Sequence, residues 1–259
     1  MPVFNNILAG ASGQSTTGYD IDQSLRFKDG SSGGKLTFTP ASPASSDKKY
    51  TYSFWFKGKS DMAGINDNKD FDFLTAVNTD WDSCSLGRLN GKLAWFLQGG
   101  TGGYIVTTQE FRDPASWYHC VLRYDSTDAT AGDRMRMFVN GEEVTAFDTD
   151  TNPALNYSIL NLNQSGVLQE INRSQDGSYP ASCYMAEVHM IDGTALGPAS
   201  FGQTDAATNQ WKPIEYTGSY GTNGFYQKYS STELAASFED SAWHQTHTVT
   251  AGGDAHTDT

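Results

Sequence analysis

Hard oxygen donors gather in one stretch of the chain, between residues 61 and 72. Asp61, Asn66, Asp67, Asn68 and Asp70 in this stretch have side chains of the kind that Ca²⁺ prefers, and we take them as candidate ligands. Their spacing is not that of an EF-hand, and Asp and Asn are also the residues favoured in turns. The sequence therefore predicts either a calcium site or a polar turn here, and both interpretations stay open.

A second stretch has the residue types that contact sugars. Trp81 follows Asn78 and Asp80, and a glycine-rich segment at 99–103 leads into Tyr104. A sugar needs an aromatic platform together with polar groups that hydrogen-bond its hydroxyls. We therefore take Asn78, Asp80, Trp81 and Tyr104 as a candidate glycan site, although a loop Trp can equally cap a core or be buried at a subunit contact.

The elements that must position these residues are short β-strands. Apolar and polar residues alternate in runs separated by Gly, Asn, Asp and Ser, which is typical of a sandwich or barrel. We expect strands at 23–28, 35–39, 50–57, 71–77, 92–98, 104–108, 117–124, 134–139, 143–147, 166–171, 183–191 and 246–251. The pairs Asn90-Gly91 and Asn140-Gly141 predict tight hairpins. No sustained helical pattern is present.

Alternation within the runs predicts which side chains are buried. In 50–57, Tyr52, Phe54 and Phe56 share one face, and Thr51, Ser53 and Trp55 share the other. We expect Trp55, Trp95 and Trp117 to lie in the core. His119 and His189 fall within strand-like runs, where a buried structural histidine is the favoured interpretation. His244 and His247 lack a third ligand that would support zinc.

The segments outside these runs divide the chain into three parts. Residues 1–20 are rich in Gly, Ser and Thr and predict an N-terminal arm, residues 21–202 form the sandwich, and residues 203–259 form a C-terminal appendage and tail. Six aromatic residues of the last part are too apolar to stay exposed, so they pack on the sandwich or on a neighbouring subunit. They are Trp211, Tyr216, Tyr220, Phe225, Tyr226 and Trp243.

Composition excludes several classes of partner. The 259 residues include 17 Lys and Arg against 30 Asp and Glu, a formal net charge of -13. A nucleic-acid backbone or an anionic membrane surface needs clustered cations, so neither is an expected partner. No apolar run is long enough to cross a membrane, and the first residues lack the basic and apolar regions of a signal peptide. The three cysteines suit a reducing compartment, with Cys120 and Cys183 as buried thiols.

The strand motifs, in order, resemble the laminin-G-like (LamG-like), concanavalin A-like lectin/glucanase family. The motifs are YTYSFWFKGK, FRDPASWYHCVLRYD (with Trp117, Tyr118 and His119 at matching positions), RMRMFVNGEEV and CYMAEVHMIDGTAL. This resemblance implies an all-β, two-layer antiparallel jelly-roll sandwich with extended N- and C-terminal arms.

Glucanases of this fold carry a carboxylate cluster, E-x-D-x-(x)-E, along one strand, aimed from one face. That spacing is absent here. Glu142 and Glu143 are adjacent, and no carboxylate lies two or four residues from Glu110, Glu170, Glu187 or Glu215. No histidine lies near a nucleophile elbow. The chain is therefore expected not to be an enzyme, with a glycoside hydrolase as the less favoured alternative.

A narrower resemblance joins both arms to the sandwich. NNILAGASG, YDIDQSLRFKDG, ALGPASFGQTDAATNQWKP and YTGSYGTNGFYQKY are similar to LamG-like proteins of tailed, particularly marine, bacteriophages. The resemblance implies a virion structural protein, either of tail-fibre type for adhesion or a capsid-surface decoration. Its implied partners are other virion proteins, copies of itself in a homo-oligomer (a trimer is the usual symmetry of such fibres) and a host-cell glycan. The alternative is a free carbohydrate-binding lectin module.

Overall fold

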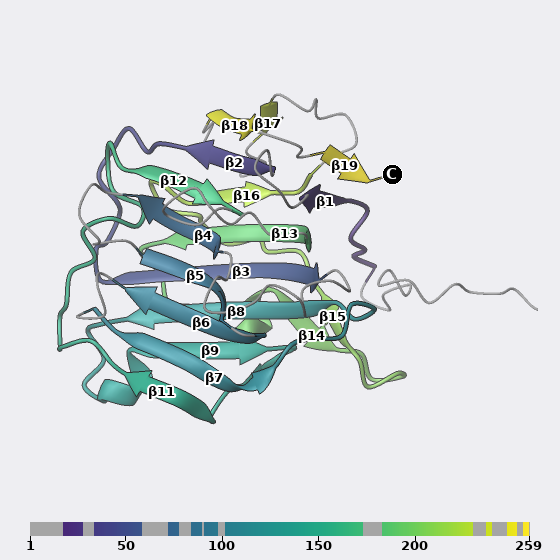
Figure 1. The fold of residues 1–259 in the computed structure, drawn as a ribbon, viewed down its shortest axis with the longest axis horizontal. Helices are drawn as coiled ribbons and strands as arrows, with labels where there is room; N and C mark the ends of the chain where they lie inside the picture. The colour runs from purple at the N-terminus through teal and green to yellow at the C-terminus, as the bar shows by residue number, and fades with distance from the viewer. Residues whose placement is uncertain are drawn as a thin grey trace, which may run out of the picture.

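The protein is a sandwich of two antiparallel sheets, seen in the computed structural model as a front and a back layer (Figure 1). The structure describes residues 18–27, 34–58, 72–77, 84–89, 91–97, 102–172, 183–229, 237–239, 248–252 and 256–258. No helix in this described part is long and apolar enough to span a membrane. The layered all-β architecture agrees with the prediction.

The back layer is an eight-stranded sheet. Its order is β10 (Glu142–Glu143), β9 (Met135–Val139), β8 (Tyr118–Asp125), β3 (Lys49–Gly58), β13 (Cys183–Asp192), β1 (Ser24–Phe27) and β19 (His256–Asp258), and β16 (Phe225–Gln227) also pairs with β13. β13 thus has β3 on one side and both β1 and β16 on the other.

The front layer is a nine-stranded sheet. Its order is β11 (Phe147–Thr151), β7 (Tyr104–Glu110), β6 (Lys92–Leu97), β5 (Cys84–Leu89), β4 (Asp72–Val77), β12 (Leu168–Ile171), β2 (Lys35–Phe38), β18 (Thr248–Gly252) and β17 (Ser237–Glu239). A separate ribbon joins β14 (Gly202–Thr204) to β15 (Trp211–Pro213), and short 3-10 turns lie at η3 (Ala131–Asp133) and η4 (Pro198–Ser200).

Alternating side chains fill the space between the two sheets. Tyr52, Phe54 and Phe56 of β3 point into this core, as the alternation predicts, and are at most 1% exposed. Leu93, Trp95 and Leu97 of β6 meet them from the front sheet. At the β9–β10 hairpin Asn140 and Gly141 have φ of 49° and 84°, which confirms the tight turn predicted for Asn-Gly.

Two predicted features are wrong in detail, and a third residue is buried as predicted but in a different layer. The run at 143–147 is not one strand, because its start belongs to β10 in the back sheet and its end begins β11 in the front sheet. Trp117 lies just before β8 and is only partly buried, with its ring centroid 6.5 Å from that of Tyr184. Trp55 is buried but on the outer face of the back sheet, outside the inter-sheet core.

The segment predicted as an appendage extends both sheets. β16 and β19 add to the back sheet, and β17 and β18 add to the front sheet. At the other end of the chain, residues 1–17 of the predicted arm lie outside the described residues. Tyr19, at the end of that arm, bonds to Glu187 and Tyr226 on the back sheet.

Candidate functional site

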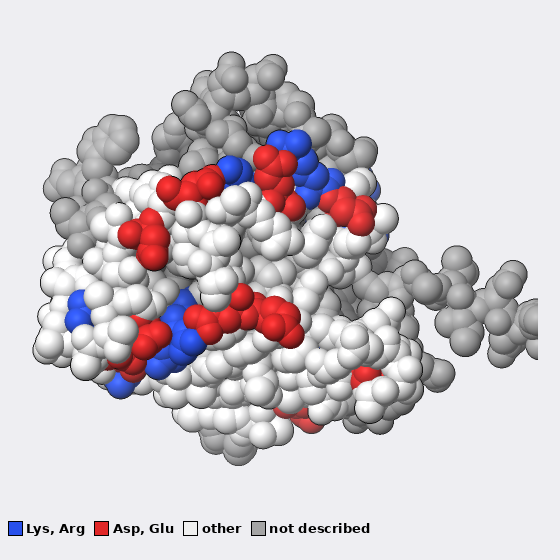
Figure 2. Space-filling model, turned by 90° about the horizontal axis from the view of Figure 1, so that it is seen from below, with Lys and Arg blue, Asp and Glu red and all other residues white. Residues whose placement is uncertain are grey.

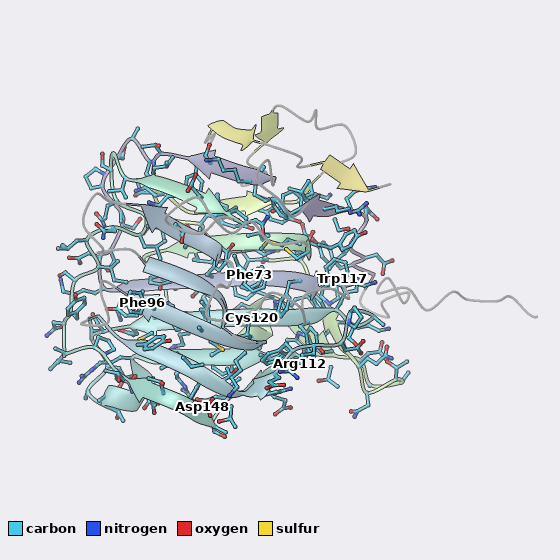
Figure 3. All side chains as sticks on the ribbon, viewed as in Figure 1. Phe73, Phe96, Arg112, Trp117, Cys120 and Asp148 are labelled. Atoms are coloured by element: carbon cyan, nitrogen blue, oxygen red, sulfur yellow. The ribbon has the colours of Figure 1, made fainter. Side chains whose placement is uncertain are left out.

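A pair of aromatic rings lies on the outer face of the front sheet. Phe96 of β6 is opposite Tyr104 of β7, and their ring centroids are 5.4 Å apart in an edge-to-face arrangement. Both side chains are partly exposed, whereas the residues on either side of Phe96, Trp95 and Leu97, are buried in the core. The strict alternation of β6 therefore turns Phe96 outward, toward one end of the front sheet (Figure 3).

Several loops leave the sandwich beside this pair. β4, β6 and β11 finish at the same end of the front sheet where β5, β7 and β12 begin, as the pairings Ala76–Cys84, Cys84–Leu97, Phe96–Tyr104, Tyr104–Thr151 and Val77–Leu168 show. We call this the Tyr104 end. Asn78, Asp80 and Trp81 lie outside the described residues, but the strands that flank them end and begin here. Val77 and Cys84, the described residues that flank this loop, both lie at the Tyr104 end, and the candidate glycan site itself stays a prediction.

The third loop at the Tyr104 end packs against the second. It spans residues 152–167, between β11 and β12. A Cβ added at Gly102 would lie 2.9 Å from the ring of Tyr157, and one added at Gly103 would lie 3.2 Å from Pro153. Gly103 also has φ of 121°, so it tolerates no side chain on conformational grounds either. These glycines let the chain turn tightly into Tyr104.

The outward row that contains the aromatic pair continues across the sheet and becomes buried. Beyond β5 the register places Thr75 of β4, Glu170 of β12 and Thr37 of β2 in the same row. Thr75 is 0% exposed and Glu170 is 4% exposed. Glu170 accepts a bond from Lys35 Nζ at 2.5 Å. The row is therefore buried at Thr75 and Glu170 and partly exposed at the aromatic pair and again at Thr37.

The predicted calcium ligands Asp61, Asn66, Asp67, Asn68 and Asp70 lie outside the described residues. Their loop joins Gly58 of β3 to Asp72 of β4. Asp72 is the first residue of β4 and Val77 the last, so this loop enters the front sheet about 17 Å from the Tyr104 end. Within the described residues no cluster of three or more His, Cys, Asp or Glu side chains could hold a metal ion. The calcium site stays a prediction.

The outer face of the back sheet carries a second aromatic group, centred on His119. His119 is 1% exposed, and its ring lies 4.9 Å from that of Trp55. Trp211 Nε1 donates to His119 Nδ1 at 2.9 Å, so the ring proton is on Nε2, which lies 2.9 Å from Ser53 Oγ. Burial lowers the pKa of His119 to about 3. The ring is neutral and is hydrogen-bonded at both nitrogens, which confirms the prediction of a buried structural histidine.

A buried carboxylate lies further along the same face, at a bulge in β13. Glu187 has φ of 47° and is 4% exposed. It accepts bonds from Tyr19 at 2.5 Å and from Tyr226 at 2.7 and 2.8 Å. Burial, reinforced by the Glu187 charge, raises the pKa of both tyrosines. The carboxylate therefore ties the N-terminal segment to β16 through neutral hydroxyl donors.

The predicted interface residues that can be described lie against the chain's own back sheet or core. Tyr226 stacks on His189 with ring centroids 4.3 Å apart, and Tyr220 donates to or accepts from His189 Nδ1 at 2.9 Å. Tyr216 packs on Phe201, Phe225 enters the inter-sheet core, and Trp211 covers His119. Trp243 lies outside the described residues. The back sheet is thus covered by its own C-terminal segment, and any contact of these rings with a second subunit stays a prediction.

Two residues of interest were missed in the sequence. The signal for Phe96 is the alternation of KLAWFL, which places Trp95 in the core and Phe96 on the opposite face. The role of Glu187 could not be predicted from the sequence, because the neighbouring residues do not indicate a bulge in this strand. The bulge turns Glu187 toward Tyr19 and Tyr226.

Two antiparallel sheets, with the outer face of one covered by the chain's own C-terminal segment, define an all-β sandwich. The chain belongs to the Laminin_G_3 family of the concanavalin A-like lectin/glucanases superfamily, whose family model matches residues 29–200. This confirms the family suggested by the strand motifs.

Solved structures with a similar fold come from distant proteins. A heptameric SAP-like pentraxin from Limulus polyphemus is 18% identical, with 68% of this chain and 78% of that chain covered and a TM-score of 0.48. Domains LG4-5 of the mouse laminin alpha1 chain are 10% identical, with 79% and 46% covered and a TM-score of 0.44. A Trypanosoma rangeli sialidase solved with sialic acid is 12% identical, with 70% and 27% covered and a TM-score of 0.44. No curated protein matches the sequence.

Proposed function

We propose that the protein is a non-enzymatic, glycan-binding LamG-like protein that serves as a structural component of a tailed-phage particle. The observation that carries the binding role is the partly exposed Phe96–Tyr104 pair at the sheet end from which the Trp81 loop leaves. The family supports this role, because its superfamily takes its name from lectins and glucanases.

The aromatic pair supplies what a sugar ring needs from a protein. The C–H face of a pyranose is apolar and gains about 25 cal/mol for each Å² that an aromatic face removes from water. Its hydroxyls then need hydrogen-bonding partners, since each one buried without a partner costs about 1–3 kcal/mol. Thr151, opposite Tyr104 in the register, and Asn78 in the adjoining loop have side chains of that kind.

Binding without hydrolysis is supported by the position of Glu170. Among the described residues it is the carboxylate in the same outward row as the aromatic pair, and Lys35 is bonded to it. It lies four strands from Tyr104, which is about 19 Å. A sugar held on the platform would therefore be out of reach of this acid. Retaining hydrolysis needs two carboxylates about 5 Å apart across the scissile bond.

A glycan array tests the binding role. We expect the wild-type chain to bind a subset of glycans, and Tyr104→Ala or Phe96→Ala to weaken that binding at least about tenfold, the usual scale for an aromatic anchor. Tyr184→Ala is the matched control, because Tyr184 is a partly exposed strand tyrosine on the back sheet. Equal binding to every glycan would contradict the proposal. So would binding that neither Tyr104→Ala nor Phe96→Ala weakens.

The particle role is supported by the resemblance of both arms to phage LamG-like proteins, and tail-fibre adhesion is favoured over capsid decoration because the fold suits adhesion. Mass spectrometry of purified particles tests it, and absence of the protein from them would contradict it. A particle reconstruction would then give its location, its neighbours and whether the copies form a trimer. If the protein is instead a free lectin, it should still bind a subset of glycans on the array but should be absent from purified particles.

A further inference from the structure

A buried polar cluster lies where β13 ends. Asp192, the last residue of β13, is 2% exposed, and its Oδ2 accepts bonds from Ser45 N at 2.7 Å and Asn223 N at 3.0 Å. Asn223 Nδ2 donates to the carbonyls of Ser42 and Asn163 at 2.7 and 2.9 Å. The back sheet, the loops that precede β3 and β12, and the segment that precedes β16 therefore meet at one point. We call these five residues the Asp192 cluster.

Three side-chain atoms of the Asp192 cluster are buried and have no hydrogen-bond partner among the described residues. They are Asp192 Oδ1 and both polar atoms, Oδ1 and Nδ2, of the Asn163 amide, and Asn163 is 5% exposed. Asn223 bonds to both residues, so they lie within the reach of one side chain. Buried polar atoms in native proteins are nearly always bonded, and those that lack a protein partner indicate a bound water or ion. The Asp192 cluster is therefore a candidate binding site for one of these.

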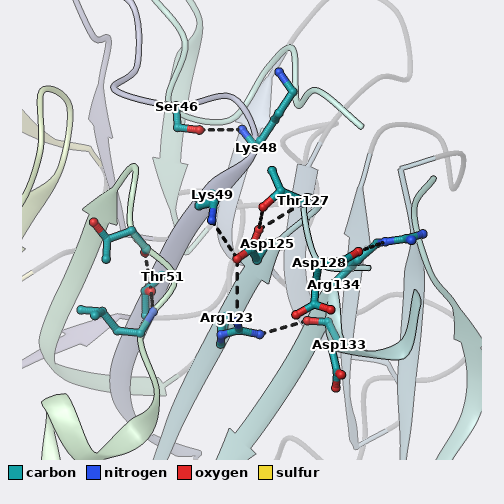
Figure 4. Close-up of polar contacts among 12 residues, drawn as sticks. Ser46, Lys48, Lys49, Thr51, Arg123, Asp125, Thr127, Asp128, Asp133 and Arg134 are labelled. Atoms are coloured by element: carbon teal, nitrogen blue, oxygen red, sulfur yellow. Dashed lines mark hydrogen bonds and ion pairs between the residues drawn. The ribbon is translucent and has the colours of Figure 1, made fainter. Parts of the chain in front are cut away.

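The buried charge of Asp192 favours an ion over a water molecule. No Lys or Arg in the described part of the chain forms an ion pair with Asp192. Lys49, from the strand beside β13, is directed to Asp125 instead, with its Nζ 3.1 Å from Oδ2, and Arg123 lies 3.8 Å from the same oxygen (Figure 4). A buried charge needs a paired charge or a bound metal ion, because burial removes its hydration. A water molecule would leave the charge of Asp192 in place, whereas a cation neutralises it.

Other carboxylates of the protein already have such partners. Among the described residues, Asp125, Glu170 and Asp205 are buried, and each has a Lys Nζ within 3.1 Å. Glu187 accepts bonds from two tyrosine hydroxyls. At the surface, too, acidic groups lie beside basic ones on the face drawn in Figure 2. Asp192 is thus a buried carboxylate to which the described residues supply neither a Lys or Arg nor a hydroxyl donor.

The donors of the Asp192 cluster indicate the kind of cation. They are one carboxylate oxygen, one amide oxygen and the carbonyls of Ser42 and Asn163, all of them hard oxygen donors. A carbonyl oxygen has two lone pairs, so one that accepts a bond from Asn223 can still bind an ion. The single carboxylate supplies one negative charge. A monovalent cation balances it, whereas a divalent ion would leave a positive charge without a partner in a buried site.

We infer that the Asp192 cluster binds an alkali-metal cation, Na⁺ or K⁺, which fastens two loops and the C-terminal segment to the end of β13. Ser42 and Ser45 are exposed, so the cluster lies close to the surface from which an ion enters. The inference does not depend on the proposed glycan-binding function, because the cluster shares no residue with the Phe96–Tyr104 pair.

Thermal melts of the full chain in different salts test the inference. The buffers have equal ionic strength and contain EDTA, and their salt is NaCl, KCl or choline chloride, whose cation is too large for the cluster. An ion that binds only the folded chain raises Tm. At a salt concentration about twenty times the dissociation constant, the rise is about 4–7 °C for a chain of this size. We expect NaCl or KCl to give this rise over choline chloride.

Two substitutions locate the ion. Asp192→Asn keeps the shape and a side-chain acceptor but removes the charge, so it should abolish the rise in Tm that NaCl or KCl gives. Asn163→Ala removes the two unpartnered amide atoms and should reduce the rise by about half or more. Asp47→Asn is the matched control, because Asp47 is a surface carboxylate of the loop before β3 that lies 3.2 Å from Lys48. This control should keep the full rise.

Three results would overturn the inference. Equal Tm of the wild-type chain in all three salts would leave only water as the ligand. A rise that both Asp192→Asn and Asn163→Ala retain would place the ion elsewhere. A rise given by 1 mM CaCl₂ in choline chloride without EDTA, lost in Asp192→Asn and not given by NaCl or KCl, would make the site divalent. None of these results alters the glycan-array test of the proposed function.

Discussion

The bond between Trp211 and His119 allows a quantitative test of how the C-terminal segment is held. Trp211 Nε1 donates to His119 Nδ1 at 2.9 Å, and no other contact to that nitrogen replaces it within the described residues. Trp211→Phe keeps an aromatic ring over His119 and removes the donor. A buried acceptor left without a partner costs about 1–3 kcal/mol, so the free energy of unfolding should fall by that amount.

The assay is urea denaturation followed by circular dichroism, together with a thermal melt. For a chain of this size each kcal/mol lowers Tm by about 2–4 °C. Trp117→Phe is the matched control, because Trp117 is partly exposed and its ring contact is with Tyr184. We expect that control to stay within about 0.5 kcal/mol of wild type.

A double-mutant cycle isolates the bond from the packing. His119→Phe alone leaves the Trp211 donor and Ser53 Oγ without their shared partner. In the double variant both members of the Trp211–His119 bond are gone, so only Ser53 Oγ is left without its partner. The double variant should therefore lose less stability than the sum of the singles, by about 1 kcal/mol or more. Losses that add to within about 0.3 kcal/mol would refute the coupling.

Three shorter predictions concern other groups. The pKa of about 3 for His119, against about 6.5 in the unfolded chain, means that unfolding takes up a proton between these values. Urea denaturation should therefore show that the free energy of unfolding falls by up to about 1.4 kcal/mol per pH unit as the pH drops from 6.5 toward 3. The double variant lacks His119 and should show a shallower dependence on pH. Equal slopes of free energy against pH for the two proteins would contradict this. Gly141→Ala should lower the free energy of unfolding by about 1–3 kcal/mol more than Gly166→Ala. Both glycines have positive φ, but a Cβ at Gly141 would lie 2.4 Å from the Trp211 ring, whereas one at Gly166 has no atom within 4 Å. Equal losses of stability would argue against that clash. Cys120 and Cys183 are buried thiols whose pKa is raised by burial, so both should resist DTNB until urea unfolds the chain, and fast native labelling of either would be inconsistent with their burial.

Much of the fold could be predicted from short-range pattern. Alternation in β3 and β6 reports which side chains meet the core, because successive residues of a strand point to opposite faces. The Asn140-Gly141 turn is equally local, since both central positions of its hairpin need positive φ. The all-β class, the inward-facing aromatics and this hairpin therefore required no knowledge of distant contacts.

The outer faces could not be predicted in the same way. Thr51, Ser53 and Trp55 of β3 share the face opposite the core, yet all three are buried. Trp211 lies over that face because β15 follows a long connection from the end of β13. Contacts between residues so far apart in the chain produce no periodic pattern in the sequence. Alternation therefore predicts that a strand has two faces, but not which segment covers each face.

The candidate site shows the same division. The sequence by itself determined that Tyr104 follows a glycine-rich segment and that the segments 78–83, 98–103 and 152–167 contain no Lys or Arg. Only the tertiary structure set Phe96 against Tyr104, brought the loop at 152–167 to the same sheet end, and engaged Lys49, Arg123 and Arg134 with acidic or carbonyl partners. The physical reason is that residue types are local, whereas strand register and the pairing of charges depend on which segments the fold makes neighbours.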